Sequence, residues 1–320
     1  MAFIRTILGD IEAATFGVCY AHEHVVIDES FTTEQTPDFL LADVEKILPE
    51  LAAFRASGGR AMVDSMPGGG AGRNVLKLAD VARRSGIHIL CPTGLHLAKY
   101  YPAGHWSNRA SEDELTQLFT DEIELGIDTN DLAGPTIWRS PHRAGLVKVA
   151  GGKDRLSDRE QRTFIAAART QLKTGCPILT HTEEGTAALE QVELLKANGA
   201  DLSHVVLSHT DRKPDISYHR EILSTGVKVE YDSCFRWKSG NPTLDLLPFL
   251  LTEFPDQIML GMDAARNKYW KSFGGGPGLD FLLTEFTQRM TQAGISEERL
   301  NRVFVRTPAQ TFSFINRSSQ

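Results

Sequence analysis

The stretch CPILTHTEEGTAALEQVELLKANGADLSHVVLSHT, residues 176–210, contains the pattern that decides the fold. Short apolar runs at 176–182 and 204–210 flank a longer segment, 186–198, in which apolar residues recur with helical spacing. Both runs contain β-branched residues and end in His-Thr. This order predicts a strand, a helix and a second strand that lies parallel to the first.

The same unit recurs along the chain. Eight apolar runs are predicted as strands, at 18–28, 60–66, 87–94, 144–151, 176–182, 204–210, 227–233 and 257–263. Helical patterns fall between them, at 40–57, 74–85, 111–125, 157–174, 186–198, 215–224 and 244–254. Eight such units close into a (β/α)8 TIM barrel, whereas five or six would form an open doubly wound sheet. We therefore predict an α/β protein with a TIM barrel in one domain, residues 1–320, with additional C-terminal helices within 279–294 and 295–314.

The composition favours a protein that acts on small molecules. The formal charge of −7 comes without a basic stripe, so we expect no nucleic acid partner. No apolar run is long enough to cross a bilayer, and the first residues lack the apolar core of a secretory signal. We therefore expect no membrane association and a cytoplasmic location. The four cysteines show no CxxC spacing, which disfavours a zinc ribbon or a disulfide framework.

Two histidines, His22 and His24, stand at the end of the first predicted strand with Glu23 between them. Side chains alternate across a strand, so both imidazoles are expected on one side and Glu23 on the other. A lone histidine is most often a hydrogen-bonded core or surface residue. Two histidines at this spacing, at the carboxyl end of a barrel strand, can bind one metal ion.

Further residues of metal-binding type end other predicted strands. His181 ends the fifth strand, His209 the sixth and Asp263 the eighth. The carboxyl ends of barrel strands meet at one face, so these side chains are expected to lie beside His22. Imidazole nitrogens with a carboxylate suit zinc, with cobalt, manganese or nickel as substitutes. Of the other histidines, His96 in the loop after the third strand is expected to face a substrate.

The fourth predicted strand carries Lys148 within the apolar run GLVKVAG. A charged lysine is costly to bury there unless it has a partner or loses its charge. One interpretation is a lysine that reaches outward to an acidic neighbour. The other is a neutral amine that reacts with carbon dioxide, because the resulting carbamate is anionic and can bridge two cations through its two oxygens.

These residues resemble the phosphotriesterase family of the amidohydrolase superfamily. The resemblance extends over nearly the whole chain, from AHEHVVID through GLVKVAG, the stretch 180–211 and LGMDAAR to RTPAQTF. It implies a site for two divalent metal ions, with zinc as the expected metal. It also implies the ligands, which are His22, His24 and Asp263 for the buried ion, His181 and His209 for the more exposed ion, and carbamylated Lys148 as the bridge.

Basic residues follow the last two predicted strands. Arg236 and Lys238 come after the seventh strand, and Arg266, Lys268 and Tyr269 come after the eighth. Barrel loops at these positions often bind phosphate, and such groups offer charge-assisted hydrogen bonds to anionic oxygens. The alternative is a set of solvated loop charges that form surface pairs. By resemblance to the branch of the family that hydrolyses sugar lactones bearing a phosphate, Lys238, Arg266 and Tyr269 would hold the phosphate.

The sequence thus predicts a binuclear metal-dependent hydrolase, a lactonase whose substrate is an anionic sugar lactone phosphate. A hydroxide that bridges the two metals would attack the carbonyl, and Asp263 would act as acid and base. A phosphotriesterase, a carboxylesterase or an amide hydrolase on the same metal centre is an alternative, because loops set the leaving group. A non-catalytic binding protein is disfavoured, since every expected ligand position is filled. The resemblance also suggests a homodimer.

Overall fold

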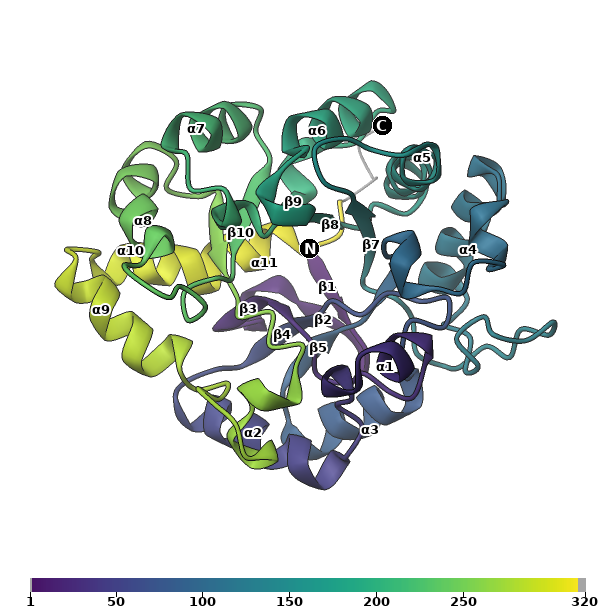
Figure 1. Ribbon diagram of the computed structural model, residues 1–320, viewed down its shortest axis with the longest axis horizontal. Helices are drawn as coiled ribbons and strands as arrows, with labels where there is room; N and C mark the ends of the chain where they lie inside the picture. The colour runs from purple at the N-terminus through teal and green to yellow at the C-terminus, as the bar shows by residue number, and fades with distance from the viewer. Residues whose placement is uncertain (1, 316–320) are drawn as a thin grey trace.

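The computed structural model describes residues 2–315, which form a ring of parallel strands surrounded by helices (Figure 1). This part of the chain contains eight barrel strands, and the strands that pair within the ring are parallel. They are β3 (Cys19–Glu23), β4 (Ala61–Asp64), β5 with β6 (His88–Leu90 and Pro92–Gly94), β7 (Leu146–Gly151), β8 (Ile178–Thr182), β9 (Val205–Ser208), β10 (Lys228–Tyr231) and β11 (Ile258–Leu260). β5 and β6 are two halves of one barrel strand, interrupted at Cys91.

The ring closes between the last strand and the first. The backbone N–H groups of Met262 and Asp263 donate to the carbonyl oxygen of His22 at 3.3 and 3.0 Å. Glu23 reinforces this junction, because its carboxylate accepts hydrogen bonds from the N–H groups of Met262 and Ala264 at 2.7 and 3.2 Å. The predicted eight-stranded barrel is confirmed, and an open sheet is excluded.

Helices that follow the strands form the outer layer (Figure 1). They are α2 (Val44–Ala56), α3 (Val75–Ser85), α4 (Glu112–Glu124), α5 (Asp158–Thr174), α6 (Ala188–Ala197), α7 (Ile216–Ser224) and α8 (Pro242–Glu253). The largest departure from the predicted ranges is at α2, which was expected from residue 40. It begins at Val44 because the side chain of Asp43 caps it by accepting a hydrogen bond from the N–H group of Glu45.

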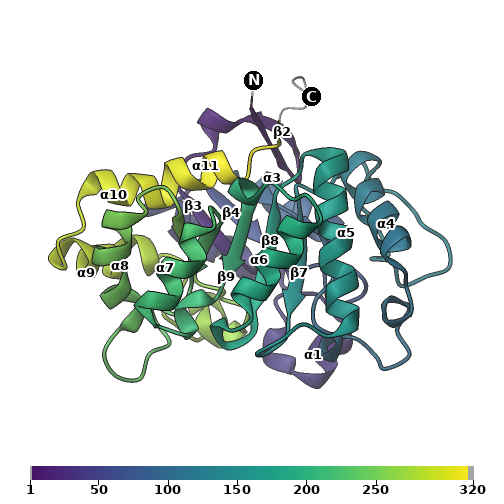
Figure 2. The same ribbon diagram turned by 90° about the horizontal axis from the view of Figure 1, so that it is seen from above.

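The first and the last described residues pack together at the amino-terminal end of the barrel strands (Figure 2). The hairpin of β1 (Phe3–Thr6) and β2 (Gly9–Glu12) meets the last described residues there, where the rings of Phe3 and Phe314 stack at 4.8 Å. The predicted C-terminal helices are confirmed as a series of short elements, which are α9 (Thr287–Gln292), α10 (Glu297–Asn301), α11 (Thr307–Thr311) and the π-helical turns Leu282–Phe286 and Arg302–Arg306.

The barrel interior is apolar at one end and polar at the other. Leu146 and Leu179 point inward and pack with Phe312 beneath the barrel. Two residues further along the same strands, the inward positions carry Lys148 and His181, which line a cavity. The polar side chains of the interior therefore gather at the carboxyl ends of the strands.

Strand β3 is irregular near its two histidines. Cys19 and Ala21 belong to the apolar interior, so regular alternation would turn Glu23 inward and the histidines outward. The register between β3 and β4 shifts within this segment. Beyond the shift His22 and His24 both line the cavity, while Glu23 binds backbone N–H groups.

No helix between residues 2 and 315 is long and apolar enough to cross a membrane. The organisation of residues 1–320 as one domain and the homodimer stay predictions.

Candidate metal centre

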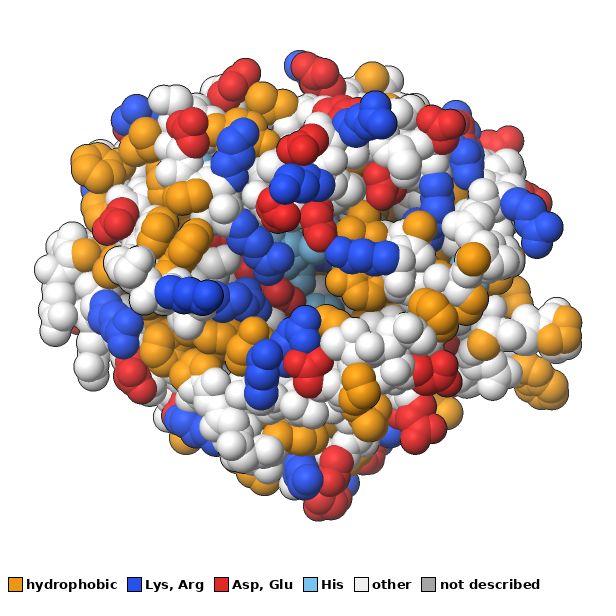
Figure 3. All heavy atoms as spheres, in the orientation of Figure 1, with side chains coloured by type: hydrophobic (Ala, Val, Ile, Leu, Met, Phe, Trp, Pro, Cys, Tyr) orange, Lys and Arg blue, Asp and Glu red, His pale blue; other side chains and the backbone are white. Residues whose placement is uncertain are grey.

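A cavity of about 380 Å³ opens at the carboxyl ends of the barrel strands. Figure 3 looks into it, with histidine rings at the bottom and lysine and arginine side chains around the opening. Its wall contains all of the predicted metal ligands, which are His22, His24, Lys148, His181, His209 and Asp263. It also contains most of the predicted substrate contacts, namely His96, Arg236, Arg266 and Tyr269.

His22, His24 and Asp263 form the tighter group of potential ligands. Nε2 of His24 lies 3.2 Å from Oδ1 of Asp263, and Nε2 of His22 lies 3.7 Å from the same oxygen. The backbone of Asp263 has a φ of +46°, in the left-handed region that non-glycine residues rarely adopt, and such strain is common at functional sites. Two imidazole nitrogens that converge on one carboxylate oxygen fit a divalent metal ion such as zinc.

His181 and His209 form a second pair, with ring centroids 4.6 Å apart. Nε2 of His181 lies 2.7 Å from Oε2 of Glu183, and Nδ1 of His209 contacts a carboxylate oxygen of Asp232. Each ring therefore keeps one nitrogen free of these bonds. Burial lowers the pKa of His181 and lowers the pKa of His209 to about 3, so both rings are neutral, which is the form that binds a metal. Within residues 2–315, two groups of potential ligands have atoms that all lie within 4.8 Å of one another. Both groups contain His22, and neither contains His181.

Lys148 lies inside the barrel and does not reach outward. Its side chain is buried, and its Nζ atom is 3.5 Å from the carbonyl oxygen of Thr180. Burial lowers the pKa of Lys148 to about 7, although Glu230 and Asp263 favour the charged form and oppose the shift. A large fraction of this amine is therefore neutral near pH 7, and a neutral amine is the form that reacts with carbon dioxide.

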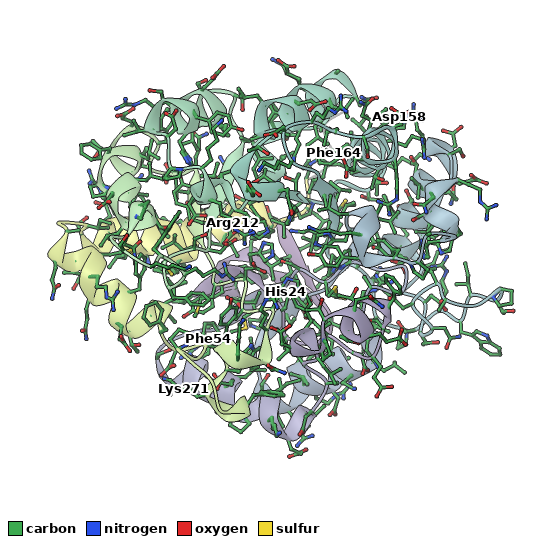
Figure 4. The ribbon with its side chains drawn as sticks, in the orientation of Figure 1. His24, Phe54, Asp158, Phe164, Arg212 and Lys271 are labelled. Atoms are coloured by element: carbon green, nitrogen blue, oxygen red, sulfur yellow. The ribbon has the colours of Figure 1, made fainter. Side chains whose placement is uncertain are left out.

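Two arginines hold the carboxylate of Asp263. Nη2 of Arg212 and Nη2 of Arg236 donate to its Oδ2 atom at 2.8 and 3.1 Å. Burial by itself raises the pKa of Asp263, but Arg236 and the contact with His24 hold it well below its usual range. Figure 4 shows Arg212 and His24 near the middle of the ring. Arg212 is absent from the predicted site, although its place directly after His-Thr-Asp at the end of β9 was a signal.

Two acidic side chains associated with β10 were also not predicted. Asp232 contacts His209, and Oε2 of Glu230 lies 3.6 Å from Nδ1 of His22. Within the described residues, neither carboxylate oxygen of Glu230 receives a hydrogen bond, and burial raises its pKa well above the usual value. The spacing of the two acids in VKVEYDS was the available signal, because alternation places both on the same side of a strand.

The predicted phosphate contacts differ in their positions. Arg266 lines the cavity, but it also donates to both carboxylate oxygens of Asp38 at 2.7 and 2.6 Å and lies over the ring of Phe39. Tyr269 lines the cavity as well. Lys238 is exposed and is not part of the wall, so its contact with substrate stays a prediction.

Known proteins resemble this chain over nearly its full length. Residues 2–312 match the phosphotriesterase family. The phospho-furanose lactonase of Mycoplasmopsis agalactiae is 31% identical over 324 residues, which cover 98% of this chain and 92% of that protein. The crystal structure of an amidohydrolase from Mycoplasma synoviae has a TM-score of 0.94 at 30% identity, over 98% of this chain and 93% of that one. For a lactonase from Listeria monocytogenes the TM-score is 0.89 at 31% identity, over 98% and 100% of the two chains. The chain therefore belongs to the phosphotriesterase family of hydrolases.

Proposed function

We propose that this protein is a lactonase that opens the ring of a sugar lactone bearing a phosphate. One observation carries the proposal: the wall of a single cavity combines side chains of metal-binding type with cationic side chains such as Lys99 and Arg266. The first set suits hydrolysis of a carbonyl compound, and the cations suit the anionic end of the substrate. Relatives that carry the name phospho-furanose lactonase support this substrate class.

Two divalent metal ions, with zinc as the favoured metal, would occupy the cavity. Their ligands would be His22, His24 and Asp263 for the buried ion, His181 and His209 for the exposed ion, and Lys148 as a bridging carbamate. Imidazole nitrogens and carboxylate oxygens are donors that zinc accepts readily. When bound, such ions lower the pKa of water and polarise a carbonyl oxygen.

Asp263 is proposed as the acid and base of the reaction. Its carboxylate is ionised in the resting protein, so it can accept the proton of the attacking water. It can then return this proton to the alkoxide that leaves when the C–O bond of the ring breaks. Arg212 and Arg236 bind Oδ2 and leave Oδ1 beside His24, so these arginines are proposed as positioning residues.

The phosphate of the substrate would bind to Arg266 and Tyr269, with Lys238 as a further contact, while Arg236 and His96 would contact the lactone. Arg266 offers a planar set of N–H donors that suits phosphate oxygens. Asp38 now occupies part of this donor set. The phosphate would therefore share or replace the Asp38 contact.

A substrate panel with metal analysis on the same preparation tests the proposal. The panel contains sugar lactones with and without phosphate, a carboxylate ester, an amide and a phosphotriester. We expect the highest kcat/KM for a phosphorylated lactone, loss of activity after chelation and recovery with zinc. Full activity in metal-free protein would contradict the metal centre, and a higher kcat/KM for the amide or the triester would contradict the lactonase assignment.

A further inference from the structure

A chain of polar contacts connects the cavity opening with His181. Nζ of Lys99 lies 2.7 Å from Oε1 of Glu183, and Oε2 of the same carboxylate lies 2.7 Å from Nε2 of His181. Lys99 is in the loop after β6, and Glu183 directly follows β8. All three side chains line the cavity. Glu183 thus uses its two oxygens to join a loop cation to a proposed ligand of the exposed metal ion.

The contact with Glu183 decides which nitrogen of His181 is available. A carboxylate accepts a hydrogen bond, so Nε2 carries the hydrogen and Nδ1 keeps its lone pair. The rings of His96 and His209 are close neighbours, with centroids 5.0 and 4.6 Å from that of His181. These neighbours limit how far the His181 ring can turn. The carboxylate therefore determines the tautomer of a ring whose surroundings are already confined.

The other proposed ligand of the exposed ion has a different kind of partner. His209 contacts Asp232, whose side chain is fully buried. The side chain of Glu183 is 27% exposed and that of Lys99 is 53% exposed. A carboxylate in contact with water has other hydrogen-bond partners available and is free to change rotamer. Lys99 supplies the charge that keeps Glu183 in place, and its ammonium also lies 5.4 Å from the ring centroid of Tyr100.

We propose that Glu183 is a positioning residue for the exposed metal ion, and that Lys99 holds Glu183 in the orientation that this role requires. Glu183 presents Nδ1 of His181 to the metal by binding the opposite nitrogen. A carboxylate on the far nitrogen also makes the imidazole a stronger electron donor, and loss of such a partner commonly weakens metal affinity by about 10–100-fold. The inference rests on the proposed metal centre, but it does not depend on the identity of the substrate.

The ion pair of Lys153 with Glu184, the residue after Glu183, provides a matched control. Nζ of Lys153 lies 2.6 Å from Oε2 of Glu184, and the Lys153 side chain is 52% exposed, close to the value for Lys99. This pair has the same chemistry in the same region of the surface, but no contact of Glu184 with His181 occurs among the described residues. Substitutions of Glu184 and Lys153 therefore report the effect of losing a surface ion pair alone.

The experiment measures zinc binding to the metal-free protein, in bicarbonate buffer and without substrate. Calorimetric titration resolves the two binding steps for the wild type and for Glu183→Ala, Glu183→Gln, Lys99→Met, Glu184→Ala and Lys153→Met. Thermal unfolding of each metal-free variant is measured in parallel. These readouts separate a change at one metal site from a general loss of stability.

We expect Glu183→Ala to weaken the binding of one of the two zinc ions by about 10–100-fold and to leave the affinity for the other unchanged. Glu183→Gln should retain part of the affinity, because its amide oxygen still accepts a hydrogen bond from Nε2. Lys99→Met should weaken the binding of the same zinc ion by a smaller factor. It should have no further effect on that affinity when it is combined with Glu183→Ala. Both control variants should match the wild type.

Wild-type affinity for both zinc ions in Glu183→Ala would overturn the proposal. Equal loss of affinity for both zinc ions, together with a lower melting temperature of the metal-free variant, would also overturn it, since that result indicates a structural role. A wild type that binds fewer than two zinc ions would overturn both the proposal and the metal centre. Two bound ions with the expected Glu183 effect, but no hydrolysis of any lactone, would support the proposal and refute only the proposed reaction.

Discussion

Nε2 of His24 lies 3.2 Å from Oδ1 of Asp263, which joins the end of the first barrel strand to the end of the last. The same carboxylate binds two arginines through its other oxygen. Asp263 is therefore held from both sides, with one oxygen directed toward the imidazoles. A side chain in this position affects both metal binding and proton transfer.

Asp263→Asn should nearly abolish activity. The amide keeps the size of the side chain but removes its charge and its ability to accept a proton. We expect kcat for the lactone to fall on the order of 10²–10⁴-fold, the usual range for loss of a general acid or base, with weaker zinc binding. Steady-state kinetics and metal analysis check this prediction. Asp280→Asn, which alters an exposed pair with Lys271, serves as the control, and full activity of Asp263→Asn would refute the mechanism.

Zinc uptake should depend on carbon dioxide and rise with pH. An ordinary lysine, with a pKa of about 10.4, is neutral in about one molecule in 2,500 at pH 7. Burial lowers the pKa of Lys148 to about 7, so its neutral, reactive fraction grows as pH rises through this value. Metal-free protein should therefore bind zinc faster with added bicarbonate, and more so at pH 8 than at pH 6. Uptake that is indifferent to bicarbonate would argue against the carbamate, and Lys148→Met should show no response.

Arg266→Met should impair recognition of the phosphate and leave the lactone chemistry intact. We expect KM for a phosphorylated lactone to rise at least about tenfold, since a charge-assisted hydrogen bond contributes roughly 1.5–3 kcal/mol. KM for the unphosphorylated analogue should change little. Lys271 is a suitable control, because it lies at the edge of the molecule (Figure 4) and pairs with Asp280 at 2.7 Å. Equal effects of Arg266→Met on both lactones would mean that Arg266 does not bind phosphate. We expect Lys238→Met to have the smaller effect, since Lys238 is exposed outside the wall.

Arg73→Met should strongly destabilise the barrel. The guanidinium of Arg73 binds both carboxylate oxygens of Glu122 at 2.8 Å and donates to Asp131 at 2.8 Å, and all three residues are buried. Removing one partner of a buried ion pair costs about 3–5 kcal/mol, because it leaves a buried charge without compensation. Urea unfolding measures the loss. Disruption of the exposed Arg220–Glu253 pair should lower the free energy of unfolding far less, because water screens exposed charges, and a similar loss for both variants would contradict the prediction.

His219 should make stability fall in mild acid. Burial lowers the pKa of His219 to about 4, and its ring lies between the Lys213 carbonyl at 3.0 Å and the Tyr231 hydroxyl at 2.8 Å. An unfolded histidine has a pKa of about 6.5, so between these values the unfolded state binds the extra proton. The contribution of His219 to the free energy of unfolding is fully present above a pH of about 6.5 and is lost as pH falls toward about 4. The total loss is about 3 kcal/mol. Urea unfolding of metal-free His219→Gln should show a shallower pH dependence than the wild type. Parallel curves would contradict this assignment.

Much of the architecture could be predicted because it depends on neighbouring residues. Alternation along strands and helical periodicity between them define eight units, and the rule that barrel strands end at one face brings His22, His181 and His209 together. Helix boundaries differ from the predicted ranges where a cap decides them, as Asp43 does for α2. Even the His22 and His24 pair depends on a register shift in β3 that simple alternation does not include.

The missed residues have partners from distant parts of the chain. Arg212 contributes to the site because it binds Asp263, and Glu230 because its carboxylate lies near the imidazole of His22. A buried acid in one strand gives no indication of which cation or imidazole it will meet. Such pairs are decided when the ring closes.

The sequence by itself determined the barrel and the types of side chain at its carboxyl face, since both follow from local periodicity and strand order. Only the tertiary structure decided that Arg266 is paired with Asp38, that Lys238 lies outside the wall and that Glu183 connects Lys99 to His181. The physical reason is that loop side chains take their positions from charges and hydrogen bonds on other loops. No spacing along the chain relates those partners to one another.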